Sequence, residues 1–160
     1  MHERIDYATV SPAGLAAMRA LDRHLQSSPL GQTLLELVKI RTSQLNGCAY
    51  CIDMHTKMAR AQGETEQRIY ALTAWRETPF FSERERAALA WTETLTQLQD
   101  GVPEGHYEYA RQHFDEVELV DLTYAIVAIN GWNRVAIAFR KVPGSFHVAS
   151  SSLPGVVATS

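Results

Sequence analysis

Hydrophobic residues recur every three or four positions along most of this chain, which is the spacing of an amphipathic helix. Leu15, Met18, Leu21 and Leu25 show the pattern clearly, and few segments alternate as a half-buried strand would. The pattern predicts an all-α, single-domain bundle of six to seven helices. They are expected at about residues 12–26, 29–46, 48–62, 65–75, 82–99, 103–113 and 115–140.

Residues that favour helix ends stand at the expected boundaries. Ser11-Pro12 provides an N-cap followed by proline at the first helical position, and Ser28-Pro29 repeats this arrangement. Ser82-x-x-Glu85 is a capping box. Asn46-Gly47 is a typical helix stop, so a short turn is expected between the second and third helices.

The most apolar stretch, residues 119–139, is about as long as a membrane span. It contains Asp121, Asn130, Asn133 and Arg134, and charged side chains are costly in lipid. We therefore interpret it as a buried or oligomer-interface helix. The last part of the chain, residues 143–160, is rich in Pro, Gly and Ser and is predicted to be an irregular tail, which leaves 1–142 as the helical domain.

Composition narrows the function classes. With 160 residues, 46% hydrophobic and 21% charged, the chain suits one packed domain. Its net charge is −3 and it has no run of Lys and Arg, so no nucleic-acid partner is expected. The first residues show no secretory signal pattern, so a cytoplasmic protein without a membrane partner is expected. Two cysteines are too few for a disulfide scaffold.

Reactive side chains are concentrated in one segment. Cys48 and Cys51 are three residues apart, and His55 follows the second cysteine by four, so all three share one helix face. Glu36 lies twelve residues before Cys48 and can orient the imidazole if its helix folds back at the Asn46-Gly47 turn. The set has the logic of nucleophile, base and orienting group.

Two neighbouring thiols can reduce a peroxide in two steps. One thiolate attacks the O–O bond and becomes a sulfenic acid, and the other condenses with it to a disulfide, which an external dithiol must then reduce. The helix N-terminus favours Cys48 as the more acidic thiol. The proximity of His55 favours Cys51, and we expect Cys51 to be the nucleophile because a base acts on it directly.

The pattern E-x11-C-x2-C-x3-H, from Glu36 to His55, resembles the AhpD-like alkylhydroperoxidases of the carboxymuconolactone decarboxylase superfamily. The segment Trp132-Asn133-Arg134 also looks like one found in small members of that family. The resemblance implies a cofactor-free peroxidase that acts on hydroperoxides and is reduced by a thioredoxin-like or dihydrolipoamide-type dithiol. It implies Cys51 as the attacking thiol, Cys48 as the resolving thiol, and a homo-trimer or homo-hexamer.

Alternative interpretations remain open. The best-known family member has a histidine at the position of Tyr50, and this departure makes a thiol-disulfide oxidoreductase or redox relay the main alternative to a peroxidase. A decarboxylase like the superfamily's namesake is disfavoured by the dithiol. Cys48, Cys51, His55 and Glu36 are also possible zinc ligands, although three of them on one helix suit a closed site poorly. We expect the Trp132-Asn133-Arg134 segment to pack at an oligomer interface rather than to wall a pocket.

Overall fold

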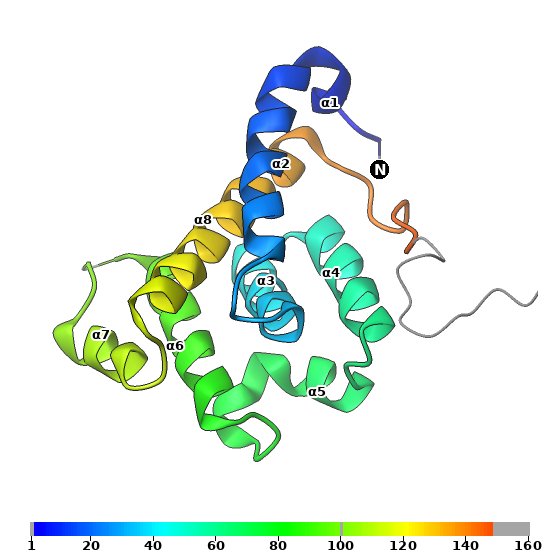
Figure 1. The fold of residues 1–160 in the computed structure, drawn as a ribbon. Coiled ribbons are helices and arrows are strands. Elements are labelled where there is room, and N and C mark those ends of the chain that lie inside the picture. Colours follow the sequence, from blue (N-terminus) through cyan, green and yellow to red (C-terminus); the bar gives the residue numbers. More distant parts are fainter. Residues whose placement is uncertain (1, 100, 149–160) are drawn as a thin grey trace, which may run out of the picture.

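The computed structural model describes residues 2–99 and 101–148, and these residues form helices connected by short turns, with no strand among them (Figure 1). The all-α, single-domain prediction is confirmed. The described elements are α1 (Tyr7–Val10), α2 (Pro12–Gln26), α3 (Gln32–Asn46), α4 (Ala49–Ala61), α5 (Glu66–Ala71), the 3-10 helix η1 (Leu72–Glu77), α6 (Glu83–Gln97), α7 (Glu104–Arg111) and α8 (Glu116–Phe139).

The helix ends follow from local chemistry. The predicted capping box is present, because the Ser82 hydroxyl accepts from the amide of Glu85 and the Glu85 carboxylate accepts from the amide of Ser82. Asp115 and Glu118 form a second capping box at the start of α8. Three differences from the predicted elements are present. The four-residue α1 was not expected, and the 3-10 helix η1 continues α5 where an α-helix to residue 75 was expected. The prediction that Ser28-Pro29 starts a helix is wrong, because α3 begins at Gln32 with Gly31 as its N-cap.

The turn after α3 is a Schellman motif. Gly47 adopts the left-handed conformation, with φ 68° and ψ 30°, which costs glycine little. The amide of Cys48 donates to the carbonyl of Ser43 at 2.9 Å, and the amide of Gly47 donates to the carbonyl of Gln44 at 3.3 Å. This turn reverses the chain, so α4 runs back along α3.

Helix α3 lies at the centre of the fold and packs against α4, α6 and α8 (Figure 1). Its residues Leu35, Leu37, Val38 and Ile40 are completely buried. The apolar interior has three parts. One lies among α2, α3, α6, α7 and α8, a second among α3, α4, α5, η1 and α6, and the third is a small sulfur cluster of Cys48 and Cys51 with Ile129 and Ala136 of α8.

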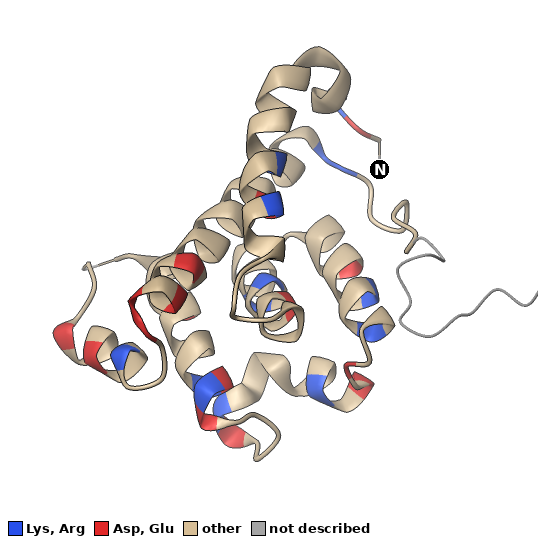
Figure 2. Cartoon of the chain, viewed as in Figure 1, with Lys and Arg blue, Asp and Glu red and all other residues tan. Residues whose placement is uncertain are grey.

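Lys, Arg, Asp and Glu residues are interspersed along the helices, and residues of both signs lie close together around α5 and the start of α6 (Figure 2). There the Arg68 guanidinium contacts the carboxylates of Glu64 and Glu85. None of the helices in the described part of the chain is long and apolar enough to cross a bilayer. Of the predicted tail, residues 143–148 contain a turn and no helix, and residues 149–160 lie outside the described residues.

Candidate functional site

The structure brings the four predicted site residues together. Cys48 is the N-cap of α4, Cys51 lies in its first turn and His55 in the next. Both thiols are free, and their exposed fractions are 1% for Cys48 and 2% for Cys51. The Schellman turn places Glu36 of α3 beside His55, so all four side chains lie in the interior between α3, α4 and α8.

Glu36 is a completely buried carboxylate that holds two partners. One oxygen, Oε2, lies 2.7 Å from Nδ1 of His55, and the other, Oε1, accepts from Nζ of Lys39 at 2.9 Å. Burial raises the pKa of Glu36, but the hydrogen bonds from His55 and Lys39 and the positive charge of Lys39 outweigh it and hold the pKa below its ordinary value. The ionised carboxylate can only accept, so Nδ1 of His55 carries the hydrogen and Nε2 is left to receive a proton.

The two thiols share one proton unequally. A hydrogen bond from the Cys51 thiol, aided by the amides of Tyr50 and Cys51 and by the side-chain amide of Asn133, lowers the pKa of Cys48 to about 7 despite burial. The same hydrogen bond, burial and the negative charge on Cys48 raise the pKa of Cys51. The pair therefore holds its first negative charge on Cys48, at the helix N-terminus, as expected from the dipole argument.

Asn133 of α8 stabilises the negative charge on Cys48 by a hydrogen bond from its side-chain amide. Its side chain is completely buried, its amide nitrogen donates to Ser43 Oγ at 3.0 Å, and its carbonyl oxygen accepts from Asn46 at 2.9 Å. Since Asn46 occupies the carbonyl, the amide hydrogens are directed to Ser43 and the sulfur atoms. Asn133 is therefore buried within the chain, whereas Arg134 is exposed, and the expectation that this segment packs at an oligomer interface stays a prediction.

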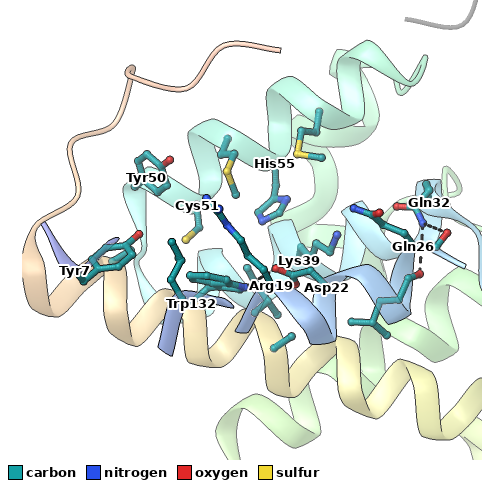
Figure 3. A pocket seen from close by; sticks show the side chains of 17 residues that line it. Tyr7, Arg19, Asp22, Gln26, Gln32, Lys39, Tyr50, Cys51, His55 and Trp132 are labelled. Atoms are coloured by element: carbon teal, nitrogen blue, oxygen red, sulfur yellow. Dashed lines mark hydrogen bonds between the residues drawn. The ribbon is translucent and has the colours of Figure 1, made fainter. Parts of the chain in front are cut away.

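A cavity of about 270 Å³ lies beside the thiols, between α2, α4 and α8 (Figure 3). Cys51 and His55 line it, whereas Cys48 does not reach its wall. Trp132 also lines the cavity and donates its indole N–H to Asp22 at 2.9 Å. Most of the remaining wall is apolar, contributed by Leu15, Leu25, Met54, Met58, Ala128, Ile129 and Ala136.

Among the described residues, the imidazole of His55 makes no hydrogen bond to the sulfur of Cys51. Both groups face the same cavity, so a proton can pass between them through a small molecule placed there. Within the same residues, no group of three His, Cys, Asp or Glu side chains is arranged to hold a metal ion.

Sequence reasoning identified neither Lys39 nor the cavity residues of α2 as parts of the site, and for Asn133 it favoured an oligomer interface over the wall of a pocket. Lys39 follows Glu36 by three residues, a spacing that is common on helix surfaces and carries no special signal. Asn133 could have been suspected, because an asparagine within an apolar helix needs a partner when it is buried.

Comparisons with known proteins concern the family and the fold of the chain. The carboxymuconolactone decarboxylase family model matches residues 12–94, slightly more than half of the chain and inclusive of all four predicted site residues. The uncharacterized protein YdfG of Bacillus subtilis is 47% identical over 139 residues, which are 86% of this chain and 95% of YdfG.

Two solved structures are also similar. A protein of unknown function from Agrobacterium tumefaciens, suggested to be the antioxidant defence protein AhpD, is 43% identical with a TM-score of 0.85, over 89% of this chain and 98% of its own. An uncharacterized peroxidase-related protein from Silicibacter sp. TM1040 is 25% identical with a TM-score of 0.76, and the match covers 84% of this chain and 72% of the Silicibacter chain. Family model, relatives and fold agree, and the chain is an AhpD-like member of the carboxymuconolactone decarboxylase family.

Proposed function

We propose that this protein is a thiol-dependent peroxidase that reduces organic hydroperoxides through a dithiol/disulfide cycle. The observation that carries the proposal is the coupled pair of buried thiols, of which Cys51 faces a cavity that also holds an imidazole oriented by a buried carboxylate. Suggested antioxidant and peroxidase-related roles of the similar structures support it.

The proposed cycle begins at Cys51. This step uses the form of the pair in which both thiols are protonated, because a negative charge on Cys48 opposes ionisation of Cys51. His55 accepts the Cys51 proton at Nε2, through a water or the peroxide itself, while Glu36 stabilises the imidazolium. The thiolate attacks the terminal oxygen of the hydroperoxide, the O–O bond breaks, and the departing alkoxide takes the proton from His55 to leave as an alcohol. Cys51 is then a sulfenic acid.

The second step uses the acidity of Cys48. The backbone amides at the start of α4 and the side chain of Asn133 still favour the Cys48 thiolate after Cys51 has been oxidised. This thiolate attacks the sulfur of the sulfenic acid, forms the disulfide and expels hydroxide, which takes up the proton released by Cys48 to become water. Two thiols and one hydroperoxide thus give one disulfide, one alcohol and one water. An external dithiol, thioredoxin-like or dihydrolipoamide-type, returns both sulfurs to thiols.

Variants of the two cysteines test the assignment. The reduced protein is mixed with cumene hydroperoxide, and the thiols are followed together with a sulfenic-acid trap. Cys51→Ser should lose the reaction, whereas Cys48→Ser should consume one equivalent and accumulate trapped sulfenic acid on Cys51. If Cys51→Ser reacts as fast as the unmodified protein, the roles assigned to the two sulfurs are wrong.

A redox relay is the second candidate. Among the described residues His55 is the only imidazole that lines the cavity, so no second imidazole assists attack on a peroxide there. Tyr50 also lines the cavity, at the position where the best-known member of the resembled family has a histidine, and this departure favours the relay as well. Turnover with peroxide is compared with turnover of a small disulfide, using dithiothreitol, thioredoxin or dihydrolipoamide as reductant. Faster reaction with the disulfide under all three reductants would establish the relay instead.

A further inference from the structure

The cavity contains a cation that the proposed cycle does not use. Arg19 lies on the inner stripe of α2 with Leu15, Asp22 and Gln26, at the spacing of one helix face. Figure 3 shows its long side chain reaching across the cavity from α2, in a wall that is otherwise mostly apolar. A guanidinium in such a position meets any molecule that approaches Cys51.

The other charges around the cavity are already engaged. Lys39 donates to Glu36 at 2.9 Å, and Asp22 accepts from the indole of Trp132 at 2.9 Å. Within the described residues, Arg19 has no carboxylate within 4.0 Å, although Asp22 is only three residues away on the same helix. Arg19 is exposed, so its charge stays solvated until a ligand replaces the water.

Arginine presents a planar fork of donors that matches a carboxylate in bidentate geometry. The apolar wall between α4 and α8 suits a compact hydrocarbon body, and about 270 Å³ is at the small end of ligand pockets. The geometry points to a preferred substrate that is a compact organic hydroperoxide bearing a carboxylate, with Arg19 binding the carboxylate while the peroxide group reaches Cys51. This inference rests on the proposed peroxidase function and specifies its substrate class.

Two hydroperoxides of nearly the same shape test the inference. One is neutral cumene hydroperoxide, and the other is the same molecule with a carboxylate at the para position of the ring. The full-length protein should show a KM for the acid about tenfold lower than for the neutral compound. Only the acid can form the charge-assisted bidentate contact with Arg19. In Arg19→Gln this advantage should disappear through a rise in the KM for the acid.

Matched variants separate charge from structure. Arg23→Gln removes a cation one turn further along α2 that does not line the cavity, and it should retain the preference for the acid. Arg19→Lys keeps the charge without the fork and should retain part of the preference. Benzoate should protect Cys51 from alkylation in the unmodified protein and not in Arg19→Gln, which gives a readout independent of turnover.

The possible failures are distinguishable. If neither hydroperoxide is turned over, the peroxidase proposal fails, and the benzoate experiment still decides whether Arg19 binds a carboxylate. If cumene hydroperoxide is turned over and the acid is not preferred, only the substrate-class inference is wrong. If Arg19→Gln slows both compounds equally, Arg19 acts on the thiol or the peroxide group, and carboxylate recognition is refuted.

Discussion

A pH titration of the two thiols tests the electrostatics of the site directly. Thiolate formation is followed by ultraviolet absorbance, and the structure predicts two separate transitions. The first should have a midpoint at a pH of about 7, for Cys48, and the second should lie above the ordinary range because Cys51 is ionised only against the charge of its neighbour. At about pH 7 roughly half of the pairs should be anionic, against about 1% for a thiol with the ordinary pKa of 9.0.

The perturbation is Cys51→Ala, which removes the hydrogen bond that contributes most to the lowered pKa of Cys48. The Cys48 midpoint should rise from about 7 toward 9.0, and the anionic fraction near neutral pH should fall by up to about fiftyfold. Alkylation should slow by less, about five- to eightfold, because a thiolate of higher pKa is intrinsically more nucleophilic. The titration is therefore the sharper assay.

Two further variants serve as controls for the titration. Cys51→Ser retains a hydroxyl donor and should leave the Cys48 midpoint closer to that of the unmodified protein than Cys51→Ala does. Tyr50→Phe retains the backbone amide at the start of α4 and should leave the midpoint in place. Coincident transitions of both thiols near 9, or an unchanged midpoint in Cys51→Ala, would refute the proposed sharing of the proton.

Three other predictions concern the relay, the polar network and the assembly. Glu36→Gln should lower kcat/KM for cumene hydroperoxide about 10²-fold, because the imidazolium of His55 loses its counter-charge. A change smaller than about threefold in stopped-flow assays would contradict the proposed proton transfer to His55. Asn133→Ala should raise the pH midpoint of the first thiol transition. It should also lower the free energy of unfolding in urea by about 1–3 kcal/mol, because the buried partners of Asn133 are left unpaired. An unshifted midpoint would exclude a role of Asn133 at the sulfur atoms. We expect light scattering to show a homo-oligomer. The double variant Val120→Glu/Val127→Glu should dissociate it, because both valine side chains are exposed on one face of α8. A monomeric unmodified protein would contradict this expectation.

Most of the fold could be predicted because the helix ends have a chemical signature in the sequence. Ser82 with Glu85 and the glycine at position 47 fixed boundaries that the hydrophobic pattern alone leaves vague. Helix α1 was not predictable, since four residues capped only by Asp6 are too short to show a period. The 3-10 geometry of η1 includes a non-helical Ala74 and depends on packing against α3 and α6.

The site was predictable where its residues are close in sequence. Cys48, Cys51 and His55 share a face through helical periodicity alone, and Glu36 needed only the reversal at Gly47. Asn133 lies 90 residues from Ser43, so their contact depends on how α8 packs on α3. For the same reason the sequence did not indicate that α2 closes the cavity or that it contributes a cation there.

The small size and separate position of the sulfur cluster affect how the protein tolerates change. Cys48, Cys51, Ile129 and Ala136 are packed apart from the two larger apolar clusters that hold the helices together. Alterations at the sulfur atoms therefore need not disturb the contacts that account for most of the folding free energy. A scaffold with this separation allows its reactive groups to be exchanged during evolution while the surrounding architecture persists.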